Sequence, residues 1–255
     1  MVRPWWGVVR VVAAAAAVVC AAAGTVRANE AANRAEALLE LNKKVKSFSA
    51  QLEIREDRGF DESVATSSLL VSRDHGWRLE GGSQGAEHIV VNDFNVSYDY
   101  YPWDKTVFKA TATGPEMKRL FRRPADELNP LSLLDPASLR LLGEGEFEGE
   151  PVAKFEGTTT TRLLAGGTAV TRNMEAWIST RDGLPRKTIE GTGETTATTI
   201  YRKVTVNPAV TAKDFQFEPP PGVKVIDVNA SALSAPDGES APPPTARADR
   251  PTTGN

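Results

Sequence analysis

The chain has 255 residues, 40% apolar and 25% charged, and its 30 basic and 33 acidic residues give a net charge of -3. This composition suits one globular domain of the larger kind and excludes a fibrous or wholly disordered protein. A nucleic-acid-binding protein needs clustered basic charge, so we expect no nucleic acid partner. With Cys20 as the single cysteine and only His75 and His88 beside it, we expect no disulfide, no metal and no cofactor.

The first 28 residues have the layout of a secretory signal peptide. Arg3 and Arg10 supply positive charge, and residues 11–23 are an unbroken run of valine, alanine and cysteine. A spanning helix needs about 20 apolar residues, so this shorter run predicts export to the periplasm rather than a retained anchor. Cleavage after Ala28 or after Ala23 would suit signal peptidase.

Cys20 permits an alternative to complete release from the membrane. It ends the apolar run, where bacterial lipoproteins are acylated and held by lipid chains, but the residue before it is Val19 instead of the usual small one. We therefore favour a discarded filler residue and keep lipid anchoring as the alternative.

Residues 29–46 predict a helix, because Ala31, Ala35 and Leu38 recur at helical spacing. The period then changes to two: Phe48, Ala50, Leu52 and Ile54 fall on one side of a predicted strand, and Ser49, Gln51, Glu53 and Arg55 on the other. This alternation is typical of a half-buried antiparallel strand.

Similar stretches follow along the chain, many of them separated by turn sequences such as Asp74-His75-Gly76 and Asp182-Gly183. Together they predict a large antiparallel sheet, with further strands at 64–72, 77–80, 88–92, 95–101, 105–113, 152–161, 168–180, 184–190, 195–206 and 223–228.

Residues 114–142 break this rhythm with leucines three or four apart. Pro115 can open a helix, Pro124 is expected to end it, and Pro130 and Pro136 divide the rest into short pieces. Short helices are marginal alone, so we expect them to lie on an apolar surface of the sheet.

Residues 229–255 contain five prolines and one large apolar side chain, Leu233, and predict a disordered tail. The expected organisation is thus a signal peptide at 1–28, one domain at 29–228 and a tail at 229–255.

No catalytic motif is evident: the sequence lacks G-x-S-x-G, a phosphate loop and H-E-x-x-H. Glu144, Glu146, Glu148 and Glu150 alternate and could hold a hard cation, but a solvated hairpin is the favoured interpretation. Tyr98, Tyr100, Tyr101 and Trp103 could form a carbohydrate or partner platform, although cross-strand packing is favoured.

The covering helices are few for a sheet of this size. If the sheet curls, its concave face and the helices need not meet in a filled core, and a dry cavity would remain that can hold an acyl chain. The alternative is an ordinary filled β core.

Three segments resemble the LolA/LolB-like family of outer-membrane lipoprotein carriers. The first is Val45-Lys46-Ser47-Phe48-Ser49-Ala50 together with Val71-Ser72-Arg73. The second is Val90-Val91-Asn92-Asp93 followed by Val96 to Pro102. The third is Asp214 to Asp227, which is similar to the family's closing F-x-F-x-P-P-x-G-V segment. The match spans nearly all of 29–228.

The resemblance implies a mainly β (α+β) fold: a curved antiparallel half-barrel with an N-terminal helix and short lid helices over an apolar cavity that receives lipoprotein acyl chains. It implies as partners an inner-membrane release complex and an outer-membrane acceptor. In the family a basic residue before a proline helps to hold the lid and gate the cavity. Arg73 matches that residue, but Asp74 replaces the proline.

We therefore expect a monomeric, non-enzymatic carrier of lipid or lipoprotein acyl chains in the cell envelope. The alternatives are a sensing or regulatory domain of the same fold and, less favoured, a hydrolase that uses Glu146 or Glu148. Apart from Arg73, the predicted wall and lid residues lie on the apolar phase of their elements: Phe48, Leu52, Ile54, Leu69, Trp77, Leu79, Phe108, Leu120, Leu131, Leu134 and Ile178.

Overall fold

The computed structural model describes residues 29–59, 61–83, 86–126, 128–162, 169–192 and 195–228. The predicted signal peptide with Cys20 and the predicted tail lie outside these residues. The described chain forms one open sheet of 12 strands in the order β12-β6-β5-β4-β3-β2-β1-β11-β10-β9-β8-β7. Neighbouring strands are antiparallel except that β12 runs parallel to β6.

The elements have the following bounds. The helical ones are an N-terminal helix at residues 29–43, α2 (Pro115–Asp126) and the 3-10 helices η1 (Pro130–Leu133) and η2 (Ala212–Phe215). The strands are β1 (Ser47–Asp57), β2 (Glu62–Ser72), β3 (Gly76–Gly82), β4 (His88–Asn92), β5 (Val96–Tyr101), β6 (Thr106–Thr111), β7 (Arg140–Phe147), β8 (Glu150–Arg162), β9 (Ala169–Ser179), β10 (Pro185–Thr192), β11 (Thr195–Val206) and β12 (Lys224–Val228).

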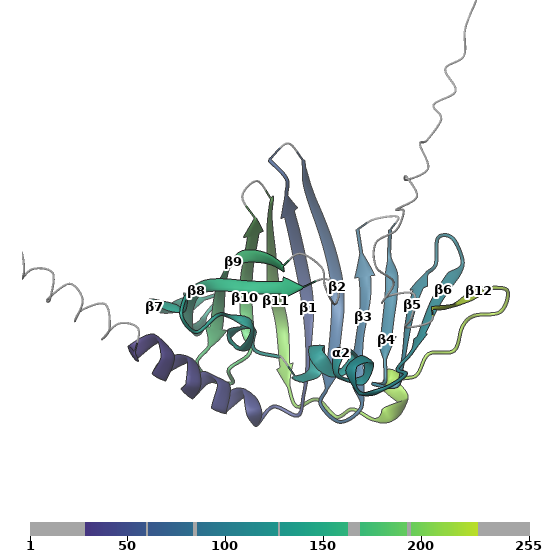
Figure 1. Ribbon diagram of the computed structural model, residues 1–255, viewed down its shortest axis with the longest axis horizontal. Coiled ribbons are helices and arrows are strands. Elements are labelled where there is room, and N and C mark those ends of the chain that lie inside the picture. Colours follow the sequence, from purple (N-terminus) through teal and green to yellow (C-terminus); the bar gives the residue numbers. More distant parts are fainter. Residues whose placement is uncertain are drawn as a thin grey trace, which may run out of the picture.

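The sheet curves into a half-barrel, with the N-terminal helix and α2 at the lower end of the strands as drawn in Figure 1. The predicted fold class, a curved antiparallel half-barrel with helices, is confirmed. No described helix carries enough consecutive apolar residues to span a bilayer.

The central strand β1 follows the predicted alternation. Phe48, Ala50 and Leu52 are buried, whereas Gln51 and Arg55 are exposed. β1 pairs with β2 on one side and with β11 on the other, so its buried face becomes the middle of the concave face.

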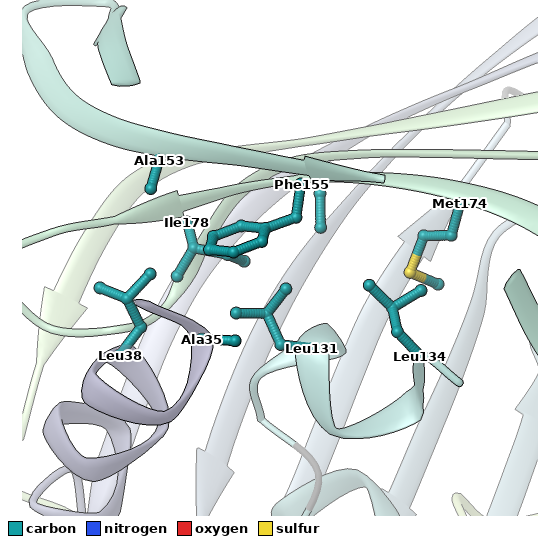
Figure 2. Packing of buried hydrophobic residues seen from close by; sticks show 9 residues of the cluster. Ala35, Leu38, Leu131, Leu134, Ala153, Phe155, Met174 and Ile178 are labelled. Carbon is teal, nitrogen blue, oxygen red and sulfur yellow. The ribbon is translucent and has the colours of Figure 1, made fainter. Parts of the chain in front are cut away.

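The buried side chains form two clusters beneath the helices. In the first, Ala35 and Leu38 of the N-terminal helix pack with Leu131, Leu134 and the β8–β9 residues Phe155 and Ile178 (Figure 2). The second joins Phe48, Ala50, Leu52 and Val71 of the sheet to Ala125, Leu128 and Leu184 of the covering segments. The helices are thus anchored at two places on one face of the sheet.

Several predicted boundaries are wrong. The helix α2 continues past Pro124 to Asp126, and the carbonyls of its last two residues accept hydrogen bonds from Arg73. The expected helical region ends before Arg140, where β7 begins and pairs with β8. The N-terminal helix ends at residue 43 instead of 46, and Val45 is buried in the second cluster.

Candidate functional site

A row of side chains crosses the concave face from the centre of the sheet toward its β12 edge. Residues directly opposite on antiparallel strands point to the same face. The register places in one row, strand by strand, Ala50, Leu69, Leu79, Val90, Asp99 and Phe108. We call its apolar members beyond the lid, Leu69, Leu79, Val90 and Phe108, the concave trough.

The concave trough is only partly covered. Leu69, Leu79 and Val90 are half-buried, and Phe108 is 38% exposed. Leu69 and Leu79 pack against the buried cluster that contains Ala50 and Leu52. An apolar surface therefore leads from the lidded part of the sheet to Val90 on β4, and beyond Asp99 it resumes at Phe108 on the open end at β6.

The predicted wall and lid residues do not form a single site. Leu131, Leu134 and Ile178 are buried in the first cluster under the N-terminal helix. A second group belongs to the other cluster or packs against it: Phe48, Leu52, Ile54, Leu69, Trp77 and Leu79. Phe108 lies at the open end of the concave trough, and Leu120 lies on α2 and is 52% exposed.

Arg73, in the turn after β2, joins the covering segments to the sheet. Its guanidinium donates to the Val45 carbonyl at 2.8 Å, to the Ala125 and Asp126 carbonyls at 3.2 and 3.3 Å, and to the Asn42 side-chain oxygen at 2.8 Å. Burial lowers the pKa of Arg73, while nearby Asp126 acts in the opposite direction. One side chain thus ties the end of the N-terminal helix to the end of α2.

Two further contacts hold α2. The Trp77 indole on β3 donates to the Phe121 carbonyl at 3.0 Å. Arg122 donates to the Arg73 carbonyl at 3.0 Å, and its guanidinium lies 4.4 Å from the centre of the Phe94 ring. Because Ala125 is the only buried residue of α2, these polar contacts are a large part of what fixes the helix.

The β9–β10 turn is held by buried amides. Asn42 and Asn129 both donate to the Gly183 carbonyl, at 3.3 and 2.8 Å. Gly183 has a φ of +72°, and a Cβ there would lie 2.2 Å from the Leu38 carbonyl oxygen. The N-terminal helix therefore approaches this turn too closely for any side chain.

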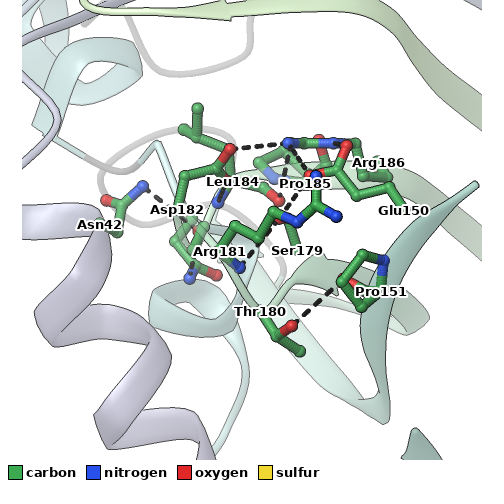
Figure 3. A network of polar contacts seen from close by, with 12 residues as sticks. Asn42, Glu150, Pro151, Ser179, Thr180, Arg181, Asp182, Leu184, Pro185 and Arg186 are labelled. Carbon is green, nitrogen blue, oxygen red and sulfur yellow. Dashed lines mark hydrogen bonds and ion pairs between the residues drawn. The ribbon is translucent and has the colours of Figure 1, made fainter. Parts of the chain in front are cut away.

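An ion-pair network lies beside this turn (Figure 3). Arg186 donates to both carboxylate oxygens of Glu150 and to Asp182, each at 2.7 Å, and Ser179 donates to Glu150 at 2.8 Å. The hydrogen bonds from Arg186 hold the pKa of Glu150 below its usual value, against the effect of burial. Among the four alternating glutamates of the predicted hairpin, Glu150 is thus held by an ion pair with Arg186.

The open end of the concave face carries a polar and aromatic group. Tyr101 donates to one oxygen of Asp99 at 2.9 Å, and its ring stacks on His88 with centres 5.8 Å apart. Trp103 and Phe108 meet the same ring edge-on at 6.2 and 5.9 Å. Burial, followed by the hydrogen bond and charge of Asp99, raises the pKa of Tyr101.

The other tyrosines lie on the opposite face. Tyr98 and Tyr100 pack against Phe217, at 5.4 and 5.7 Å between ring centres, so the segment after η2 covers the convex side of β5. The predicted aromatic cluster is therefore divided between the two faces of the sheet.

Two hollows on the convex face have mixed linings that include charged side chains. One of about 670 Å³ includes Glu156 and Glu175, which face each other across β8 and β9. Another, of about 410 Å³, includes Gln51, Ser68 and Glu80. The carboxylates in these linings suit an acyl chain less well than the side chains of the concave trough do. Among the described residues, no group of three metal-ligating side chains is close enough to hold an ion.

The described geometry defines a class: an open antiparallel half-barrel whose concave face is apolar and partly covered by short helices. No protein-family model and no curated protein matches the sequence. A solved structure of an uncharacterized conserved protein from Thermus thermophilus is 15% identical, with a TM-score of 0.51 over 76% of this chain and 99% of that one. That similarity shows a shared fold.

Two other similar structures carry descriptive names. A LolA superfamily protein from Nitrosomonas europaea is 11% identical, with a TM-score of 0.39 over 72% of this chain and 97% of that one. The MucA/MucB complex of Pseudomonas aeruginosa contains a chain 18% identical, with a TM-score of 0.43 over 74% of this chain and 61% of that one.

Some residues of the site were missed by sequence reasoning. Asn129 and Asp99 were not singled out, because a lone amide or carboxylate in a strand or loop is normally exposed. Asn42 lies at helical spacing from Ala31, Ala35 and Leu38, on the mildly apolar side of the N-terminal helix, but that position does not predict its hydrogen-bond partners. Asp182-Gly183 gave a turn signal but none for the close approach of the helix. The alternation along β5 could have placed the Asp99 side chain on the face opposite Tyr98 and Tyr100.

Proposed function

We propose that this protein is a non-catalytic carrier that binds the acyl chains of lipids or lipoproteins on its concave face in the cell envelope. The observation that carries the proposal is the concave trough, whose apolar side chains are half-buried at Leu69, Leu79 and Val90 and 38% exposed at Phe108. Each buried methylene contributes about 0.8 kcal/mol, so such a surface can bind an acyl chain without catalytic chemistry.

The lid supports this proposal. α2 buries one residue and is held by Arg73, Trp77 and Arg122 through hydrogen bonds to backbone carbonyls. Such contacts can be broken and remade without unfolding the sheet, because the buried core of β8 and β9 lies under the other helix. We therefore assign to Arg73 the role of holding α2 closed over the lidded end of the trough.

The first experiment is native mass spectrometry of the protein purified from its own envelope, followed by lipid extraction. A bound or exchangeable lipid is the expected result. Protein that carries none, and that fails to take up a fluorescent fatty acid, would contradict the proposal. A stable protein partner whose binding is altered by lipid would favour the sensing alternative.

A pair of variants then locates the site. Leu69 and Leu70 are neighbours on β2 that point to opposite faces, and both are half-buried. Leu69→Glu places a charge in the concave trough and should raise the Kd for a fluorescent fatty acid at least tenfold, about 1.4 kcal/mol. Leu70→Glu, the matched control, should leave the Kd within about twofold. Equal effects of the two variants would place binding elsewhere.

A further inference from the structure

One carboxylate interrupts the concave trough. Asp99 lies between Val90 on β4 and Phe108 on β6 in the same row. Its Oδ2 accepts the Tyr101 hydroxyl at 2.9 Å, whereas its Oδ1 is shielded from solvent and has no hydrogen-bond partner among the described residues. Shielded polar atoms without a partner are rare in folded proteins because leaving them unpaired costs free energy.

The surroundings of Asp99 are negative. Asp104 lies in the turn between β5 and β6, and its negative charge, like that of Asp99, helps to raise the pKa of Tyr101. Within the described chain, neither carboxylate forms an ion pair, and Lys109 of β6 pairs instead with Asp227 at 3.7 Å. The open end of the trough thus has two acidic groups that no cation of the described residues compensates.

Aromatic rings surround the same point. The Tyr101 ring contacts His88, Trp103 and Phe108, and Trp103 is 64% exposed. Aromatic faces beside a carboxylate are the combination that recognises ammonium groups, through cation–π attraction and charge. Trp103 and Phe108 are exposed enough to change rotamer without disturbing either buried cluster.

We propose that Asp99, Tyr101, Trp103 and Phe108 bind the primary ammonium group of a lipid headgroup, while the acyl chain of that lipid lies along the concave trough. An ammonium carries three donors, so one can serve the free oxygen of Asp99. From Asp99 to Ala50 the row crosses four strand spacings, about 19 Å. The chain would therefore run from the open end toward the lid. This inference rests on the proposed function and names its ligand class.

The test compares three single-chain lysophospholipids with the same acyl chain and different headgroups, by displacement of a fluorescent fatty acid. Ethanolamine offers a positive charge with N–H donors, choline a positive charge without donors, and glycerol hydroxyl donors without a positive charge. For the wild-type chain we expect the ethanolamine lipid to bind about tenfold more tightly than the glycerol lipid, with choline between them. Equal Kd values for ethanolamine and choline would refute the hydrogen bond to Asp99.

Asp99→Asn should remove most of this preference while the protein still binds lipid. The matched control is Asp61→Asn, at an exposed carboxylate in the β1–β2 turn, which should preserve the preference. Trp103→Leu, at a largely exposed position, provides a second variant that should fold normally and should reduce the preference at least twofold.

The outcomes separate the two proposals. Binding of all three lipids with one Kd, or a preference that survives both Asp99→Asn and Trp103→Leu, would overturn the ammonium site and leave the carrier function standing. Failure of every lipid to bind the wild-type chain would overturn the carrier function, and the ammonium site with it.

Discussion

A single glycine decides how closely the N-terminal helix can approach the sheet. Gly183 and Gly222 have similar positive φ angles, +72° and +77°, but a Cβ would lie 2.2 Å from the Leu38 carbonyl oxygen at Gly183 and would meet nothing within 4 Å at Gly222. Gly222→Ala should therefore cost only the left-handed backbone penalty of about 1–2 kcal/mol.

Gly183→Ala should cost at least about 2 kcal/mol more than Gly222→Ala, because backbone must also move away from the new methyl group. Denaturant unfolding of both variants measures the difference. Equal losses of unfolding free energy would show that the helix adjusts freely at this turn.

Arg73 is the other residue on which the covering segments depend. Arg73→Lys keeps the charge but cannot reach Val45, Asn42 and Ala125 together, since an ammonium lacks the planar fork of a guanidinium. We expect a loss of about 1–3 kcal/mol in unfolding free energy from the carbonyls left without donors. Arg58→Lys, at an exposed ion pair with Glu56, should change it by less than about 0.5 kcal/mol.

At the scale of elements, the hairpin of β7 and β8 is tied to the β9–β10 turn by charge. The pKa of Glu150 is lowered from 4.5 by its hydrogen bonds with Arg186. A carboxyl whose pKa is lower in the folded state stabilises the fold above its unfolded pKa, and that contribution is lost as the pH falls below about 4.5. Part of the acid sensitivity of the protein should therefore come from this pair.

Glu150→Gln should lower the unfolding free energy at pH 7 by about 1.5–3 kcal/mol and should flatten its decline between pH 5 and 3. Denaturant titrations at several pH values measure both effects. Glu144→Gln is the control, because Glu144 is 57% exposed and pairs with Arg34 at the surface. If the unfolding free energy of Glu150→Gln declines between pH 5 and 3 as steeply as that of the wild type, the pH dependence comes from other carboxyl groups.

The same elements show how far the sequence leads. The alternation of Phe48, Ala50 and Leu52 was sufficient to predict both the strand and its buried face, because a half-buried strand requires period two. The hairpin expected at the alternating glutamates is present as β7 and β8, but the first residues of β7 were assigned to the helical region, because Leu142 lies three residues after Leu139 and continues the helical spacing. These residues form a strand because β8 offers β7 an edge to pair with, which is a tertiary effect.

For the molecule as a whole, the two covered regions differ in what holds them. The N-terminal helix buries Ala31, Ala35 and Leu38 almost completely, so its docking is hydrophobic. α2 buries only Ala125 and relies on hydrogen bonds from Arg73 and Trp77. The sequence predicted that both helices cover the sheet and that the short ones form the lid, but the difference in how they are held depends on contacts between distant segments, which no local pattern encodes.

Hydrogen exchange should reveal this difference in how the two helices are held. Local opening needs less free energy where few apolar contacts are lost, so amides of α2 should exchange faster than those of the N-terminal helix and of β8–β9 in the free protein. A bound acyl chain adds apolar contacts along β2 to β6, and it should slow exchange in α2 and in these strands while leaving β8 and β9 unchanged. Leu69→Glu serves as the binding-deficient control and should show no such slowing. Equal protection of both helices in the free protein would mean that α2 is a fixed part of the wall. Slowing centred on β8 and β9 when lipid is added would mean that the acyl chain is held under the N-terminal helix.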